Sequence, residues 1–365
     1  SRQVFPTRYL GFPLYIGRCK TSFFAEVCQK VMGKILSWKS KFLSSGGRLI
    51  LIKHVLSAIP VHLLSAAVMP KAVFRIIERA CANFLWGSSD EGFRYHWMGW
   101  RKLCLPPEEG GVGFRRLQDV YTAFSYKLWW QFRTGSSLWT TFMRAKYCRG
   151  IHPCQAERKP FASVTWRRIQ DVSRQVELSM LWLVQDGSCH FWYDNWLGSG
   201  ALLLRSPVVL NLSFRDFIIH GHWSVHLLSQ VLSMDIAAVV LSKPVPAEQS
   251  ADDVVWMPAR SGKFSLVSAY QEVRSVGNSS FMFSWVWQRP TPAKVSFFMG
   301  RLRWGRLPLD DVLHTLGFPV ASKCRCCSPP SVASFEHVFS TGQVAESVWG
   351  FFEGLCGISS SAPYV

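Results

Sequence analysis

The spacing of apolar residues predicts helices in the first part of the chain. Between residues 71 and 86, apolar side chains recur on one side of a helix, and polar side chains occupy the other side. The apolar side carries Val73, Phe74, Ile76, Ile77, Ala80, Cys81, Phe84 and Leu85, and the polar side carries Lys71, Arg75, Glu78, Arg79 and Asn83. Pro70 is expected at the first helical position, which proline favours.

Two more helices are expected upstream of this one. A run that begins at Leu49 follows Gly46-Gly47, which predicts a turn, and Pro60 ends the run. Residues 15–36 contain an amphipathic pattern in which Phe24, Val27, Val31 and Ile35 stand at helical spacing. The first hundred residues are therefore predicted to form a helical module.

A β-like pattern replaces the helical one from Ser179. Apolar runs at 181–184 and 190–193 flank Asp186-Gly187, a favourable turn pair, and predict a hairpin. Residues 243–253 predict a polar linker, and 262–265 predict a short strand before a helix at about 267–273. The pattern as a whole indicates an α+β chain: a basic helical module at 1–105, a mixed connecting region with β-hairpins at 106–260, a small helical domain at 261–352 and a tail at 353–365.

Charge adds a partner to this picture. The 365 residues include 41 Lys and Arg against 23 Asp and Glu, a net charge of +18, which favours a polyanion. Nucleic acid is the first choice and an anionic membrane surface the second. Up to His54 the acid Glu26 stands alone among the bases Arg2, Arg8, Arg18, Lys20, Lys30, Lys34, Lys39, Lys41, Arg48 and Lys53. The alternative for these bases is a solvated helix face.

A second basic segment lies between Arg289 and Arg306. It contains five bases and no acid, with Phe297, Phe298 and Trp304 among them. Two interpretations stay open: a second nucleic-acid surface, or an amphipathic helix whose long basic side chains lie over an apolar patch.

Signals for secretion or membrane insertion are not found. No apolar core of a signal peptide follows Ser1, and the uncharged stretch between Lys53 and Lys71 is interrupted by Pro60 and two histidines. Eleven cysteines outside a secretory context indicate reduced thiols. We expect a nuclear or cytoplasmic protein, not a secreted one, and the start inside an apolar Gly-rich motif indicates a piece of something longer.

Several motifs of the first hundred residues carry a resemblance to a known family. They are Tyr9-Leu10-Gly11-Phe12-Pro13-Leu14, Trp38-Lys39, Gly46-Gly47-Arg48, Leu51-Ile52-Lys53, Val55-Leu56, Pro60 and Phe84-Leu85-Trp86-Gly87. Together they resemble the region after the polymerase palm in plant LINE-type (non-LTR) retrotransposon reverse transcriptases. The resemblance implies a thumb-like module that grips RNA or DNA template–primer without sequence preference. The residues expected at nucleic acid, here and in the second basic segment, are Lys34, Lys39, Lys41, Arg48, Lys53, Lys294, Arg301 and Arg303.

A candidate metal site lies near the end of the chain. Cys324 and Cys327 form a Cys-x-x-Cys pair and His337 follows, a set that can bind Zn²⁺. Residues 262–349 are similar to the reverse-transcriptase zinc-binding domain, on Phe264-Ser265, Ala269-Tyr270, Trp285, Trp287, Lys294, Phe297, Leu307, Glu336-His337, Phe339 and Trp349. The family usually places its last ligand, a Cys, five residues after the His, where this chain has Gly342.

Two alternatives follow for the metal. Water could complete a weak Zn²⁺ site, because Cys326 lies too close to its neighbours and Cys356 lies well downstream. Alternatively, the degenerate domain folds on its Trp and Leu core without stable metal. A redox role for the Cys-x-x-Cys pair is disfavoured, because no thioredoxin-like pattern surrounds it.

Catalysis is not expected from this chain. Polymerases need clustered aspartates that hold Mg²⁺, and the resemblance places that turn upstream of Tyr9. Asp310-Asp311 predicts a helix start, Asp252-Asp253 lacks the flanking hairpin, and Asp194 is interpreted as a structural turn residue. We therefore expect a non-catalytic C-terminal portion of an RNA-directed DNA polymerase that binds nucleic acid. The alternative is a decayed retroelement remnant that acts only as a structural or protein-interaction module.

Overall fold

The chain is mostly helical, with very little sheet. The computed structural model describes residues 5–39, 43–87, 95–206, 212–246, 250–287, 291–328 and 331–357. Among these described residues, helices account for 55% and strands for 5%, and the strands form three two-stranded antiparallel sheets. The predicted α+β class is thus confirmed only as a helical chain with minor β content. No described helix is long and apolar enough to cross a membrane.

The chain divides into two compact units. Unit 1 contains Ser1–Lys34, Val55–Glu78 and Arg115–Ser275, and unit 2 contains Ile35–His54, Arg79–Phe114 and Val276–Val365. The helices of unit 1 are α3 (Val61–Ala66), α6 (Leu117–Thr134), α7 (Leu138–Met143), α8 (Val164–Ser179), α9 (Val225–Val231), α10 (Met234–Leu241) and α11 (Leu266–Val273). Those of unit 2 are α2 (Ser45–Leu51), α5 (Trp100–Leu103), α12 (Phe281–Val286), α13 (Ala293–Arg303), α14 (Asp310–Thr315) and α15 (Gln343–Cys356). The boundary between the units falls within α1 (Ala25–Lys39) and within α4 (Lys71–Trp86).

The two amphipathic helices predicted near the N-terminus are confirmed. Phe24, Val27, Val31 and Ile35 are all buried, and α1 begins directly after Phe24. The α4 helix buries most of its predicted apolar side, although Ile76 remains 41% exposed. Pro70 precedes α4, and its carbonyl accepts the N–H of Val73, so the proline stands one position earlier than expected.

The Gly46-Gly47 pair differs from the prediction. Both glycines lie in the first turn of α2, and the Ser44 hydroxyl caps this helix by accepting the Gly47 N–H at 3.2 Å. Gly46 also suits a close approach, because a Cβ there would lie 2.8 Å from Cβ of Ala293 in α13. The pair therefore permits helix packing and does not form a turn before the helix.

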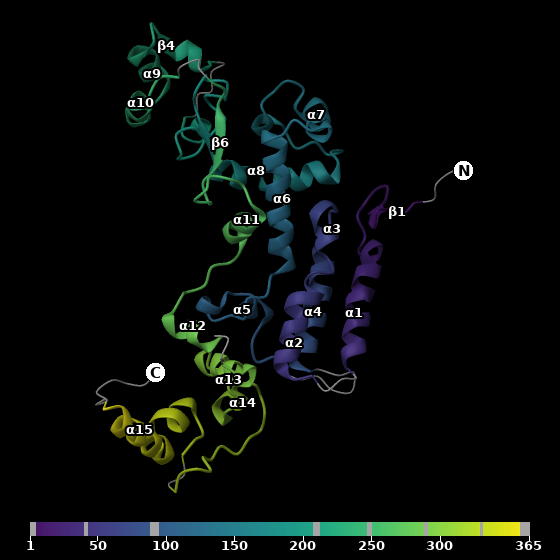
Figure 1. The fold of residues 1–365 in the computed structure, drawn as a ribbon, viewed down its shortest axis with the longest axis vertical. Coiled ribbons are helices and arrows are strands. Elements are labelled where there is room, and N and C mark those ends of the chain that lie inside the picture. Colours follow the sequence, from purple (N-terminus) through teal and green to yellow (C-terminus); the bar gives the residue numbers. More distant parts are fainter. Residues whose placement is uncertain are drawn as a thin grey trace. The chain divides into compact units, whose positions relative to one another are not determined.

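Unit 1 is built around α6, which packs against α8 and α11 (Figure 1). Trp129, Trp166 and Trp256 are almost fully buried in its core, and the ring of Tyr147 stacks on Trp166 at 4.5 Å. These three tryptophans therefore stabilise the core and offer no exposed ring face on which a nucleobase could stack.

The predicted hairpin at 181–184 and 190–193 is wrong. Strand β3 (Met180–Leu183) pairs antiparallel with β6 (Asp253–Trp256), while residues 191–193 form a turn. The Asp252 carboxylate explains this choice, because its oxygens accept the backbone N–H groups of Gln185, Asp186, Gly187 and Cys189 at 2.5–3.2 Å. The segment after β3 is thereby tied to the residue before β6, within the predicted linker.

The remaining strands are short, and the predicted strand at 262–265 is not formed. The Gly262 carbonyl accepts the Trp256 N–H at 2.7 Å, and α11 then begins near the predicted position. Strands β1 (Thr7–Tyr9) and β2 (Phe12–Leu14) pair with each other, as do β4 (Ile218–Ile219) and β5 (His222–Trp223). Between β3 and β6 the chain encloses a second apolar cluster around Phe191, Trp192 and Phe217.

A buried ion network confirms the structural role expected for Asp194. Arg133 of α6 forms ion pairs with Glu177 of α8 and with Asp194, and His152 Nε2 lies 3.1 Å from the same Asp194 oxygen. Asp194 also accepts the backbone N–H of His190 at 2.7 Å. Burial by itself raises the pKa of Asp194, but the contacts with His152 and Arg133 lower it overall. This carboxylate therefore links α6 to His152 and to the backbone at His190.

Candidate metal site and basic surface

Cys324, Cys327 and His337 come together in unit 2. Their ligand atoms all lie within 4.8 Å of one another. The Cys324 N–H donates to the Ser331 carbonyl at 2.7 Å, and His337 begins a π-helical turn, η8 (His337–Thr341), just before α15. The three predicted ligands therefore converge, although they come from two separate segments of the chain.

The surroundings of the three residues fit a metal ion. The backbone N–H of Cys326 donates to Cys324 Sγ at 3.4 Å and lowers the pKa of that thiol, which favours the thiolate that metals bind. Among the described residues, buried His337 Nε2 has no hydrogen-bond partner. An orphaned imidazole nitrogen beside two thiols is the donor set that Zn²⁺ prefers.

Gly342 stands where a fourth ligand would be needed. A Cβ at this position would lie 3.3 Å from Cys327 Sγ and 3.3 Å from the His337 ring. Position 342 therefore faces Cys327 and His337. The same Cβ would lie 2.5 Å from the His337 carbonyl oxygen, so a larger residue requires the η8 turn to shift. Cys326 is exposed and lies outside the cluster found among the described residues.

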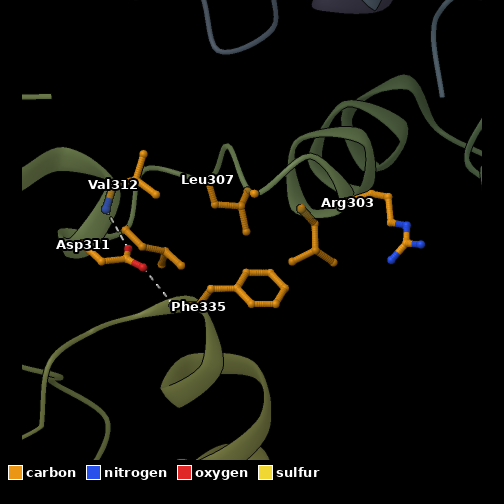
Figure 2. Close-up of a pocket in the computed structure, with 8 residues that line it drawn as sticks. Arg303, Leu307, Asp311, Val312 and Phe335 are labelled. Atoms are coloured by element: carbon orange, nitrogen blue, oxygen red, sulfur yellow. Dashed lines mark hydrogen bonds between the residues drawn. The ribbon is translucent and has the colours of Figure 1, made fainter. Parts of the chain in front are cut away.

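A shallow pocket of about 380 Å³ lies beside the end of α13 (Figure 2). Its walls are mainly apolar, and its lining residues are Leu302, Arg303, Gly305, Leu307, Leu309, Asp311, Val312 and Phe335. The Asp311 carboxylate accepts the N–H of Val312 at 2.7 Å and that of Phe335 at 3.4 Å, which ties the start of α14 to the segment before η8. Figure 2 shows the Arg303 guanidinium pointing away from Asp311. Asp310 and Asp311 open α14 as predicted, and Asp311 has a structural role.

The bases predicted near the N-terminus have different surroundings. Lys34 is exposed on α1, and Lys53 is exposed in the π-helical turn η2 (Ile52–Leu56). Arg48 donates to the Phe84 carbonyl at 3.4 Å near the end of α4, so it also has a structural contact. Lys39 ends α1, but its side chain lies outside the described residues, as does Lys41.

The second basic segment forms α13. Lys294 and Arg303 are exposed, and Arg301 is half-buried with its Nε–H donating to the Phe297 carbonyl at 3.4 Å. Within the described residues, none of these three bases lies within 4.0 Å of a carboxylate oxygen. Phe297 is buried, so this helix combines an apolar side with unneutralised bases.

Lys102 is not among the basic residues that the sequence predicts at nucleic acid. Its Nζ lies 3.8 Å from the centroid of the Trp304 ring, at the end of the second basic segment. The two residues are far apart in the sequence, so spacing gives no hint of their contact. The only available signal was the Arg101-Lys102 pair within an aromatic stretch.

Comparisons with known proteins identify the class of the C-terminal part. Residues 264–349 match the family of the zinc-binding domain in reverse transcriptase. This match confirms the resemblance found in the sequence: the chain contains a reverse-transcriptase zinc-binding domain, and it includes Cys324, Cys327 and His337.

Two plant proteins are similar over longer stretches. A "Putative ribonuclease H protein" of Arabidopsis thaliana is 28% identical over 362 residues, which cover 92% of this chain and 57% of that protein. An "Uncharacterized mitochondrial protein" of the same plant is 27% identical over 148 residues, covering 38% of this chain and 93% of that protein. The chain thus spans little more than half the length of the first relative.

Proposed function

We propose that this chain is a nucleic-acid-binding C-terminal portion of a retroelement reverse transcriptase, and that it contributes no polymerase carboxylates itself. One observation carries the proposal: basic side chains on the helices of unit 2 have no carboxylate partner among the described residues. By contrast, the ion pairs that Arg133 and His152 form with carboxylates lie in unit 1. Bases left unneutralised on a rigid scaffold favour the phosphates of a nucleic acid.

The Asp-Asp pairs support the non-catalytic part of the proposal. Asp252 is saturated by backbone N–H groups, and Asp311 ties two segments of unit 2 together. Carboxylates engaged in this way are poor ligands for the paired Mg²⁺ ions of a polymerase. The Zn²⁺ question is separate: Cys324, Cys327 and His337 would hold the ion, and its role there would be to stabilise the fold of the domain.

Salt-dependent binding tests the proposed function. Fluorescence anisotropy of a labelled template–primer duplex with the full chain is expected to give a log affinity that falls steeply with log salt. Replacing Lys53, Lys294 and Arg301 by Gln is expected to reduce the slope by about 0.7–0.9 for each phosphate that the variant no longer neutralises. A control with the same charge change replaces the exposed bases Arg174, Lys243 and Lys263 of unit 1 by Gln, and its slope is expected to stay near that of the unmodified chain.

A protein-interaction role is the second candidate, and α15 favours it. Val344, Val348, Phe351 and Leu355 recur at helical spacing and are 47–71% exposed. An exposed apolar stripe of this kind is typical of a surface that binds another protein. A flat salt response in the anisotropy experiment would support this role and contradict nucleic-acid binding.

A further inference from the structure

Phe283 and Trp304 form an aromatic platform in unit 2, and several basic side chains lie against it. Phe283 lies in α12, and Trp304 directly follows α13. Their rings stack with centroids 5.6 Å apart and planes inclined by 22°. The Trp304 indole N–H donates to the Gly110 carbonyl at 3.1 Å, so the platform is fixed to the loop after α5.

The loop under the platform requires glycine. Gly110 has φ +83°, and a Cβ there would lie 2.8 Å from the Phe283 ring. The Ser280 N–H donates to the Glu108 carbonyl at 3.0 Å, which fixes the start of α12 to the same loop. The position of the platform is thus determined by backbone contacts as well as by ring packing.

Three basic side chains lie at this platform. Lys102 Nζ is 3.8 Å from the Trp304 centroid, and Arg303 Cζ is 5.7 Å from the Phe283 centroid. Exposed Arg306 follows two residues after Trp304. Burial first, and the positive charge of Arg306 second, lower the pKa of Lys102.

No described carboxylate neutralises the three bases. Within the described part of the chain, Lys102, Arg303 and Arg306 all lie more than 4.0 Å from any carboxylate oxygen. Asp311 shares a pocket with Arg303, but the guanidinium points away from it (Figure 2). Like charges held together repel, and a bound anion would remove that repulsion.

We infer that Lys102, Arg303 and Arg306 form a phosphate-binding site on the aromatic platform, and that its ligand is a phosphodiester of a nucleic-acid backbone. This inference rests on the proposed function and assigns it a contact point. The Trp304 ring already contacts Phe283 and Lys102, so it supports the cations and does not stack on a base. The site therefore binds the phosphate backbone of the nucleic acid and does not discriminate between nucleotide sequences.

A pair of single-stranded probes tests the assignment: an oligothymidylate and an abasic phosphodiester of the same length. Replacing Lys102 and Arg306 together by Gln is expected to lower the salt slope by about 0.7 for each phosphate that is left without its cation, and equally for both probes. Lys102→Arg keeps the charge and is expected to retain the slope. Gln at the exposed Arg174 and Lys263 provides the control with the same charge change.

Three outcomes would overturn the site, and they are distinguishable from failure of the proposed function. An unchanged slope in the Lys102/Arg306 variant, with a reduced slope in the Lys53/Lys294/Arg301 variant, leaves the function standing and removes this contact point. A Lys102/Arg306 variant whose affinity is weaker for oligothymidylate alone would mean that the platform stacks on a nucleobase. An unmodified chain that binds neither probe contradicts both proposals.

Acylation of Lys102, followed by mass spectrometry, separates the sources of phosphate. The oligothymidylate is expected to slow modification of Lys102 relative to exposed Lys263 in the same sample. Protection by inorganic tripolyphosphate alone would assign the site to a free phosphate compound and contradict the phosphodiester. Protection by neither probe would show that the platform binds no phosphate.

Discussion

At the scale of single residues, the paired charges of unit 1 differ in how far they are buried. The side chains of Arg133 and Asp194 are 7% and 4% exposed, whereas those of Arg158 and Asp171 are 69% and 62% exposed. Burial by itself lowers the pKa of Arg133, but Glu177 and Asp194 raise it overall, so the arginine stays charged. Removing one member of such a network leaves the others buried and uncompensated.

Arg133→Met is therefore expected to lower the free energy of unfolding by about 3–5 kcal/mol, because two buried carboxylates lose their cation. The matched control, Arg158→Met, breaks an exposed pair and is expected to change it by about 0–1 kcal/mol. Urea unfolding followed by circular dichroism measures both. Equal effects of the two substitutions would contradict the importance of the network.

Asp252 gives a pH dependence with a definite sign. Burial by itself raises its pKa, but the backbone N–H groups that it accepts lower the pKa to about 2. A depressed carboxyl pKa stabilises the fold above the ordinary value near 3.8, and this stabilisation is lost as the pH falls towards 2. Asp252→Asn is expected to be less stable at neutral pH and to lose less stability in acid. Urea midpoints at a series of pH values measure this, and parallel curves for the two proteins would refute it.

Gly342→Cys tests the metal site. A thiol at position 342 faces Cys327 and His337, so it is expected to complete a four-ligand site and to tighten Zn²⁺ binding markedly. Competition with a chromophoric chelator measures the affinity, and Gly342→Ser controls for the shift that a larger residue forces on η8. Tight stoichiometric Zn²⁺ in the unmodified chain would show that three protein ligands suffice.

At the scale of elements, the effect on stability of replacing a glycine depends on whether it lies inside a helix or in a tight loop. Gly33 lies exposed in α1, where a Cβ would meet no atom within 4 Å. Gly33→Ala is expected to raise the free energy of unfolding by about 0.5–1 kcal/mol, because alanine favours a helix interior. A Cβ at Gly111 would lie 2.0 Å from the Leu105 carbonyl oxygen, so Gly111→Ala is expected to lower stability. Urea midpoints that shift in the same direction would contradict this contrast.

Local patterns predicted the helices but not the sheet pairing. The burial of Val27 and Val31 follows from their spacing, because helical periodicity is a local property. Strand β3 pairs with a strand far downstream, and the Asp252 contacts that favour this pairing leave no periodic signal. The candidate ligands Cys324 and Cys327 were predicted from a short motif, whereas the contact of Lys102 with Trp304 depends on the tertiary structure.

At the scale of the whole molecule, the fold does not depend on disulfides. All eleven cysteines lie among the described residues, and none of them is part of a disulfide. Alkylation in denaturant without reductant is therefore expected to add eleven labels per chain, as counted by mass spectrometry. If Zn²⁺ is bound, Cys324 and Cys327 are expected to react slowly in the folded chain and to react freely after chelation. A smaller number of labels in denaturant would reveal disulfides.

The pairing of β3 with β6 has a consequence for how this chain can change in evolution. Leu183 and Asp253 are partners in that sheet, so the intervening segment leaves the sheet and returns to it at the same place. Insertions or deletions in this segment that keep Asp194 and Asp252 in place need not disturb the path of the chain through the surrounding helices. Descendants of one ancestor can therefore differ greatly in length here and still keep the same scaffold on either side.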